Sequence, residues 1–131
     1  MNYKTREIKV RYGETDQMGI VHHSNYLKFF ELARIEWLEF LGMPYEKIES
    51  NNIILPVVKC DLHFISPLKF GDSFFINVYC KEEPKSTIEF NYEIYSSKNH
   101  KIVTKGNTVL AFLNSESMRP IRCPKIIGEL F

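Results

Sequence analysis

The sequence has little cysteine and no closely spaced cysteine pair. Its three cysteines, Cys60, Cys80 and Cys123, are odd in number and lie far apart in the chain. This spacing excludes both a disulfide framework and the paired ligands of a zinc knuckle. We therefore expect three reduced thiols, as in a protein of the cytoplasm.

Long apolar runs and an excess of one charge are also missing. Charged residues interrupt every apolar stretch before the roughly 18 residues that a membrane-spanning helix needs, and the segment MNYKTREIKVRYGE lacks the apolar core of a signal peptide. Lys and Arg number 17 against 16 Asp and Glu, so a net charge of +1 provides no strong field for nucleic acid or anionic lipid. We expect a cytoplasmic protein without a membrane span or a nucleic-acid partner.

Internal repeats, low-complexity tracts and linkers rich in Gly, Ser or Pro are absent as well. A length of 131 residues suits one domain, because domains commonly span about 100 to 200 residues. Hydrophobic residues make up 44% of the chain and aromatic residues 14%, which is ample material for one core. We expect residues 1–131 to fold as a single domain.

One long helix is predicted over Asn25–Leu41, where apolar residues recur at helical spacing before Gly42 and Pro44 end the pattern. Additional apolar residues widen the stripe beyond one face, so we expect other elements to enclose the helix. A further helical turn is predicted at 45–50. The regularly spaced residues are Tyr26, Phe29, Phe30, Ala33, Trp37, Phe40 and Leu41, and the widening ones are Leu27, Leu32, Ile35 and Leu38.

Five segments, 5–12, 57–65, 74–81, 87–95 and 101–113, have the alternating or β-rich pattern of strands. Alternation of apolar with polar side chains is typical of antiparallel strands that have one wet face. The bends between the last four segments are too short for the crossover helix of a parallel pair. The order of elements predicts an α+β domain in which a curved antiparallel sheet clasps a central helix.

The densest cluster of polar residues precedes the predicted helix. Residues 12–26, YGETDQMGIVHHSNY, contain two acids, two imidazoles and two tyrosines between the end of a strand and the start of the helix. Unpaired backbone N–H groups and the helix dipole at such a place favour developing negative charge. This position suits the oxyanion of an acyl-transfer reaction, and we expect any functional site to begin here.

Structural roles explain the same residues equally well at this point. Asp16 followed by Gly19 is typical of a turn that has Asp at its first position. Ser24 or Asn25 would cap the helix, and Tyr26 would belong to the core.

A metal site is not predicted in this cluster, because adjacent histidines point in different directions on most backbones and no supporting pattern surrounds them. On the helix itself, Glu31 and Arg34 are three residues apart, which favours an ordinary ion pair over an acid/base couple. The four residues considered as metal ligands are Glu14, Asp16, His22 and His23.

The run from Tyr12 to Glu31 resembles the signature of hot dog fold acyl-CoA thioesterases, such as 4-hydroxybenzoyl-CoA thioesterase and the Tol-Pal-associated acyl-CoA thioesterase. The resemblance covers nearly the whole chain, because the predicted element order is that of the hot dog fold and the tail MRPIRCP is similar to the family's ending. It implies a five-stranded antiparallel sheet wrapped around one long central helix. The matching residues are Asp16, Gly19, Val21, His23 and Tyr26.

The resemblance implies hydrolysis of a thioester without a cofactor. Asp16 matches the catalytic carboxylate, which acts either as a nucleophile that forms a mixed anhydride or as a general base for water, and both remain open. The backbone N–H of His23 is implied to hold the thioester oxygen, in agreement with the argument from the helix terminus. Tyr26 is counted among the substrate-binding residues.

Coenzyme A binding is implied for Lys85 and Ser86, at a turn between two strands. The 4-hydroxybenzoyl-CoA enzyme carries a basic run here, whereas this chain has Glu82, Glu83 and Pro84 before the lysine. The two acids weaken contacts to phosphate, so an acyl carrier protein is left open as the source of the thioester.

The family resemblance also implies a homo-oligomer, a dimer or a tetramer, because the sites form across a dimer interface. A non-catalytic domain that binds acyl thioesters is the alternative from another functional class, since fold alone does not establish function. A dehydratase ranks third, because the motif around Asp16 does not supply its arrangement of histidine and acid.

Overall fold

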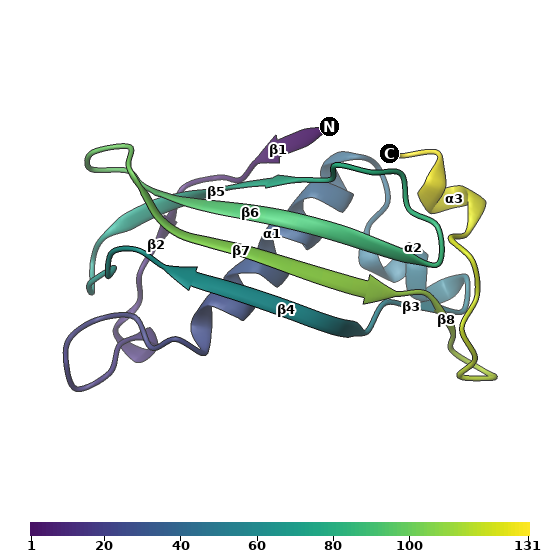
Figure 1. Ribbon diagram of the computed structural model, residues 1–131, viewed down its shortest axis with the longest axis horizontal. Coiled ribbons are helices and arrows are strands. Elements are labelled where there is room, and N and C mark those ends of the chain that lie inside the picture. The colour runs from purple at the N-terminus through teal and green to yellow at the C-terminus, as the bar shows by residue number, and fades with distance from the viewer.

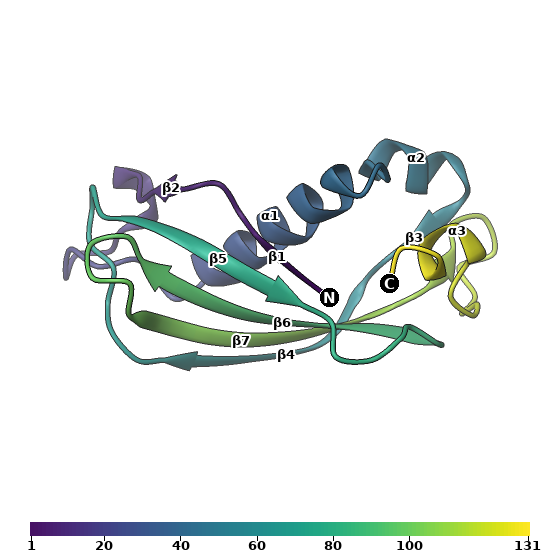
Figure 2. The same ribbon diagram turned by 90° about the horizontal axis from the view of Figure 1, so that it is seen from above.

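A long helix lies across one face of an antiparallel sheet (Figures 1 and 2). The computed structural model describes residues 1–131. The helix is α1 (Asn25–Phe40). The sheet contains β1 (Asn2–Lys4), β2 (Ile8–Lys9), β4 (Val57–Phe64), β5 (Ser73–Tyr79), β6 (Thr87–Ser96) and β7 (Ile102–Ala111). Its order is β1-β5-β6-β7-β4, and β2 also pairs with β5.

The smaller elements lie at the two ends of α1. A 3₁₀ turn, η1 (Tyr12–Glu14), precedes the helix. At the other end are α2 (Tyr45–Ser50), the paired strands β3 (Ile53–Ile54) and β8 (Leu113–Asn114), and α3 (Lys125–Gly128), which gather on the right of Figure 1. The loop before α1 therefore lies at the opposite end from the C-terminus.

The core forms where α1 crosses the middle of the sheet. Alternate residues of β5 and β6 are buried, as the period of two predicts. The Phe30 ring stacks on Tyr92 at 4.2 Å between centroids and covers Gly106 of β7, where any Cβ atom would overlap the ring. A glycine at this position lets the helix approach the sheet closely.

Most of the predicted boundaries are confirmed. The predicted helix over 25–41 corresponds to α1, the turn at 45–50 to α2, and the four later strands to β4, β5, β6 and β7 within two residues at each end. The prediction of an α+β fold with an antiparallel sheet around a long helix is also confirmed.

The single first strand predicted over 5–12 is wrong, because this segment contains only the two-residue β2, and a separate short strand, β1, precedes it. The Thr5 hydroxyl accepts the hydrogen bond of the Ile76 N–H group, at 2.9 Å, and this interrupts the regular ladder between the two short strands. The chain then turns into η1, so Tyr12 is 78% exposed instead of pointing inward. Because both pieces pair with β5, the sheet has six strands instead of five.

The expected enclosure of α1 is also wrong for the single chain. The sheet covers one side of the helix, and Leu32 and Phe40 on the other side are 46% and 72% exposed. β4 differs from expectation in a similar way, since seven of its eight residues are exposed. β4 is an edge strand that pairs only with β7, and α1 does not cover it.

The predicted ion pair between Glu31 and Arg34 is confirmed, and Arg34 is in addition buried in the core. Its Nη2 atom lies 3.9 Å from Glu31, while Nη1 donates to the Tyr92 hydroxyl at 3.1 Å. The Tyr92 hydroxyl is in turn 2.6 Å from Thr108 Oγ1. The arginine is therefore tied to the sheet as well as to its own helix.

Candidate active site

Residues 12–24 form a loop that folds back on itself between β2 and α1. Thr15 forms an antiparallel bridge with Val21, and the His22 N–H group donates to the Glu14 carbonyl at 2.9 Å. The Val21 N–H group also donates to the Leu68 carbonyl at 2.8 Å, which ties the loop to the segment that follows β4. These hydrogen bonds close the loop on itself and fix it to the segment between β4 and β5.

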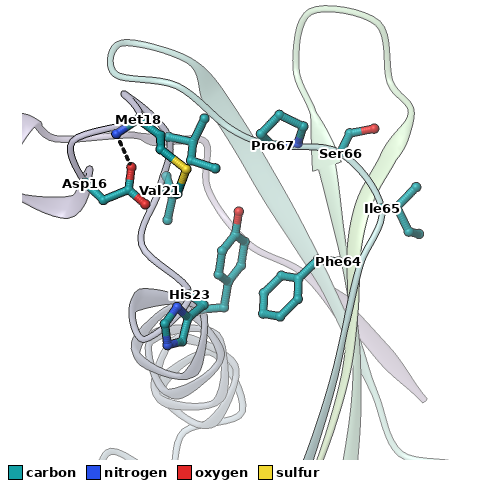
Figure 3. A pocket seen from close by; sticks show the side chains of 10 residues that line it. Asp16, Met18, Val21, His23, Phe64, Ile65, Ser66 and Pro67 are labelled. Atoms are coloured by element: carbon teal, nitrogen blue, oxygen red, sulfur yellow. Dashed lines mark hydrogen bonds between the residues drawn. The ribbon is translucent and has the colours of Figure 1, made fainter.

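Asp16 lies in the tight turn at the tip of this loop. Its carbonyl accepts the Gly19 N–H group at 2.9 Å, and Gly19 has a φ of +79°, so the predicted turn is confirmed. The carboxylate atom Oδ1 accepts the Met18 N–H group at 2.8 Å (Figure 3). One carboxylate oxygen therefore orients the side chain, and the other is left for a ligand.

A pocket of about 330 Å³ opens beside Asp16. One wall comes from the loop and the start of α1, and the other from the end of β4, as Figure 3 shows. The lining is mostly apolar, which suits the hydrocarbon part of a ligand. The lining residues are Asp16, Met18, Ile20, Val21, His23, Tyr26, Phe64, Ile65, Ser66 and Pro67.

His23 contributes an unpaired backbone N–H group at the start of the helix. Every other backbone N–H group of residues 21–26 donates to an acceptor within the chain, but that of His23 has none. Such a group next to a helix N-terminus is a donor for a developing oxyanion.

The histidine side chains and Ser24 form a small cluster of their own. The rings of His22 and His23 stack at 4.1 Å between centroids, and His22 Nδ1 lies 2.8 Å from the Ser24 hydroxyl. Ser24 occupies the N-cap position, as predicted for one of the two candidates, but its hydroxyl makes no capping hydrogen bond to the helix. The Asn25 amide instead donates to the Glu14 carbonyl at 2.9 Å.

Tyr26 belongs both to the core and to the pocket wall. It is 3% exposed, and its ring packs edge-on against Phe64 at 5.2 Å between centroids. Burial raises the pKa of the Tyr26 phenol, which keeps the hydroxyl protonated at neutral pH. The ring thus links α1 to the end of β4.

Comparison with known proteins establishes the family of the chain. The sequence profile of the thioesterase-like superfamily matches residues 10–131. The chain belongs to this superfamily. A putative acyl-CoA thioesterase of Bacillus subtilis, YneP, is 31% identical over 129 residues, covering 98% of this chain and 93% of that protein.

Two solved structures, one of which is named as a thioesterase, have the same hot dog fold. A DHNA-CoA thioesterase from Staphylococcus aureus is 30% identical with a TM-score of 0.87, covering 92% of this chain and 80% of the other. The hypothetical protein TT1821 from Thermus thermophilus is 34% identical with a TM-score of 0.89, covering 99% and 95%. The expected membership of the thioesterase family is confirmed.

Lys85 and Ser86 lie far from the pocket beside Asp16. They belong to the turn between β5 and β6, at the end of the sheet opposite the loop before α1 (Figure 1). Glu82, Glu83 and Glu89 surround the same turn, which encloses a hollow of only about 90 Å³. The structure does not bring Lys85 or Ser86 into the pocket of Asp16.

Sequence reasoning missed the second wall of the pocket, which consists of Phe64, Ile65, Ser66 and Pro67. Phe64 ends β4 and the other three follow it, and the same segment meets the loop at the bridge between Ile20 and Lys69. No local pattern reports such a pairing, because it joins segments almost fifty residues apart in sequence. In the structure, this wall is recognisable by the exposed apolar side chains of Phe64 and Ile65.

No helix of the structure is long and apolar enough to cross a membrane. No three side chains of His, Cys, Asp or Glu come together as a metal site, and all three cysteines are free.

Proposed function

We propose that this protein hydrolyses acyl-CoA thioesters to a free acid and CoA, using the Asp16 carboxylate and the His23 backbone N–H group. The proposal depends on one observation: a carboxylate with one free oxygen and an N–H group without an acceptor belong to residues that line the same apolar pocket. Membership of the thioesterase-like superfamily supports this reaction class.

The pocket geometry supports a simple division of labour. The free oxygen of Asp16 either attacks the thioester carbonyl carbon or takes a proton from the water that attacks it. In the first route the CoA thiolate leaves, and water then cleaves the mixed anhydride. In the second route the protonated Asp16 returns its proton as the thiolate leaves. Both routes place negative charge on the carbonyl oxygen, where the His23 N–H group stabilises it.

The apolar lining supports binding of the acyl group beside these two residues. Phe64, Ile65 and Pro67 face the loop across the pocket, and Tyr26 closes its base against Phe64. A carboxylate in this position argues against a purely ligand-holding role, because an acyl thioester offers no positive charge to attract it.

We further propose that a second copy of the chain completes the site along β4. This strand leaves one edge unpaired, and Val57 and Val58 are 46% and 59% exposed at its start. Phe64 and Ile65, at its other end, are pocket residues that are also about half exposed. An exposed apolar edge of this kind is a template for pairing with another chain.

Sedimentation equilibrium tests the assembly. We expect a mass of at least two chains for the wild type, and a single-chain mass with reduced turnover for Val58→Glu. Phe40→Glu, on the open side of α1, serves as a matched control and should keep both the assembly and the turnover. A fully active wild-type monomer would contradict the shared site.

The reaction itself is tested by following CoA release from short, long and aromatic acyl-CoAs. The detection must not react with the protein's own thiols. Asp16→Asn should lower kcat about a thousandfold while the protein stays folded, since positioned carboxylates typically contribute 10² to 10⁴. Glu46→Gln, an exposed acid on α2, is the control. Full activity of Asp16→Asn would overturn the role of Asp16, and turnover only of thioesters on a carrier protein would change the substrate class.

A further inference from the structure

A second and larger hollow lies behind the loop that carries Asp16. It is a groove of about 640 Å³ between β2, η1 and the first turns of α1, and it shares no lining residue with the candidate pocket. Its volume is within the range of small-molecule sites. The lining residues are Ile8, Lys9, Arg11, Gly13, Glu14, Asn25, Lys28, Phe29 and Leu32.

The charges around this groove are mainly positive. Lys9 and Lys28 form no ion pair within the chain, and Arg11 is the third cation. The one acid, Glu14, is already compensated, because its carboxylate accepts the Arg11 N–H group at 2.7 Å and lies 3.3 Å from Arg11 Nη2. The groove therefore suits a ligand with several negative charges.

The groove also offers apolar surface between these cations. Ile8 and Leu32 are partly exposed along it, and Phe29 lies beneath them. Phosphate groups alone would leave this surface uncovered. A ligand that combines phosphates with a flat, weakly polar ring, such as a nucleotide, would contact both kinds of surface.

The groove and the pocket are close neighbours along the chain. Glu14, in the groove wall, precedes Asp16 by two residues, so their Cα atoms are at most about 7.6 Å apart. The first turns of α1 separate the two spaces, since His23 and Tyr26 line the pocket whereas Asn25 and Lys28 line the groove. One extended molecule that crosses the loop would reach both.

The turn at Lys85 lacks the properties that make the groove suitable. It carries three acids and one lysine around about 90 Å³, and Pro84 is the one apolar residue in its lining. Three negatively charged phosphates would be repelled there. Of the two places, the groove is the one whose charge and size match the nucleotide of CoA.

We propose that this groove binds the phosphorylated nucleotide end of CoA while the thioester lies beside Asp16. This inference depends on the proposed thioesterase function, because it assigns the far end of the same substrate. Lys9, Arg11 and Lys28 contact the phosphates, and Leu32 contacts the adenine. The groove then determines preference for CoA over thioesters that lack the nucleotide.

Kinetics with paired substrates test the proposal. The same acyl group is supplied on CoA and on pantetheine, which lacks the nucleotide. For Lys9→Ala/Lys28→Ala we expect kcat/KM on acyl-CoA to fall at least about tenfold, as for lost charge-assisted hydrogen bonds. Activity on acyl-pantetheine should stay within about twofold of the wild type. Lys47→Ala, an exposed lysine on α2, is the matched control and should change neither value.

Direct binding separates failure of this inference from failure of the proposed reaction. Adenosine 3′,5′-bisphosphate is titrated calorimetrically into the wild type, Asp16→Asn and the double lysine variant. We expect equal binding to the first two and at least about tenfold weaker binding to the third. If no thioester is hydrolysed but this pattern holds, the reaction is wrong and the nucleotide groove stands.

Three results would overturn the groove as a nucleotide site. The first is equal binding of the bisphosphate to the wild type and the double variant. The second is a loss of acyl-CoA activity in Lys85→Ala but not in the double variant. The third is a loss confined to thioesters on an acyl carrier protein, which would make the groove a docking surface for that protein.

Discussion

The crossing of α1 over the sheet and the loop before α1 are held in place by different forces. At the crossing, Phe30, Tyr92 and Gly106 are packed in apolar surroundings, with Phe30 fully buried. In the loop, Asp16 and Gly19 are fixed mainly by hydrogen bonds to nearby backbone groups. Burial stabilises the first region, and local hydrogen bonding shapes the second.

This difference separates stability from chemistry. A packed core tolerates little change in volume, because its side chains fill the available space. A loop with few apolar contacts contributes less to global stability, yet its geometry determines where a carboxylate and an N–H group stand. Substitutions in the two regions should therefore affect different measurements.

The largest stability effect is expected for Gly106→Ala at the crossing. The added methyl group would overlap the Phe30 ring, so the helix or the ring must shift. Overpacking of this kind costs about 1 to 3 kcal/mol of unfolding free energy. Urea unfolding measures the loss, and kcat per folded molecule should remain close to that of the wild type.

A second substitution identifies the cause of that loss. If overlap with the ring destabilises Gly106→Ala, then Phe30→Leu should cost less in the Gly106→Ala background than in the wild type, since the smaller side chain makes room. If the losses of unfolding free energy from the two substitutions simply add, overlap with Phe30 is not the cause of the destabilisation by Gly106→Ala.

A smaller effect is expected for two glycines that have the same conformation in the two different regions. Gly19 in the loop and Gly42 after α1 have φ values of +79° and +81°, and an added Cβ would meet nothing within 4 Å at either. Each change to Ala therefore costs only backbone strain, about 1 kcal/mol. Gly19→Ala should displace Asp16 and lower kcat at least about tenfold, whereas Gly42→Ala should leave kcat unchanged.

Circular dichroism and steady-state kinetics on the two variants check this contrast. Equal losses of kcat would show that the loop is not special, and that any strain near α1 affects the reaction. Unchanged kcat in Gly19→Ala would show that the turn does not position the carboxylate.

Local patterns made α1 and the turn at Asp16 predictable. The helix follows from apolar spacing over one continuous segment, and the turn from Asp16 and Gly19 three residues apart. The break between β1 and β2 could not be predicted, because it depends on the hydrogen bond between the Thr5 hydroxyl and Ile76 across the sheet. Such a contact exists only after the strands have paired.

Burial was the other property that the sequence did not reveal. Arg34 is on the expected helix and near Glu31, but its side chain is buried and donates to Tyr92 of the sheet. Conversely, the alternation in β4 predicted a buried face, and its place at the sheet edge leaves both faces exposed. Both differences arise from the order of strands, which a single sequence does not specify.

The smallest effect is expected for the Cys80 thiol, which belongs to the packed region of the molecule. Burial raises the pKa of Cys80 to about 12, from an ordinary value of 9.0. The folded protein therefore keeps this thiol protonated over a range where the unfolded chain ionises it. The difference in unfolding free energy between the wild type and Cys80→Ala should therefore be constant below pH 9. Between about pH 9 and 12 the wild type should lose stability relative to the variant.

Urea unfolding of both proteins between pH 7 and 10.5 measures this difference, with Cys60 and Cys123 changed to serine in both. At pH 8, a thiol reagent should label Cys80 only when the protein unfolds. The thiolate is the reactive form, and burial keeps the Cys80 thiol protonated. Rapid labelling of the native protein at pH 8 would mean that the inner face of the sheet opens near the end of β5, and that the packed region is as accessible there as the loop.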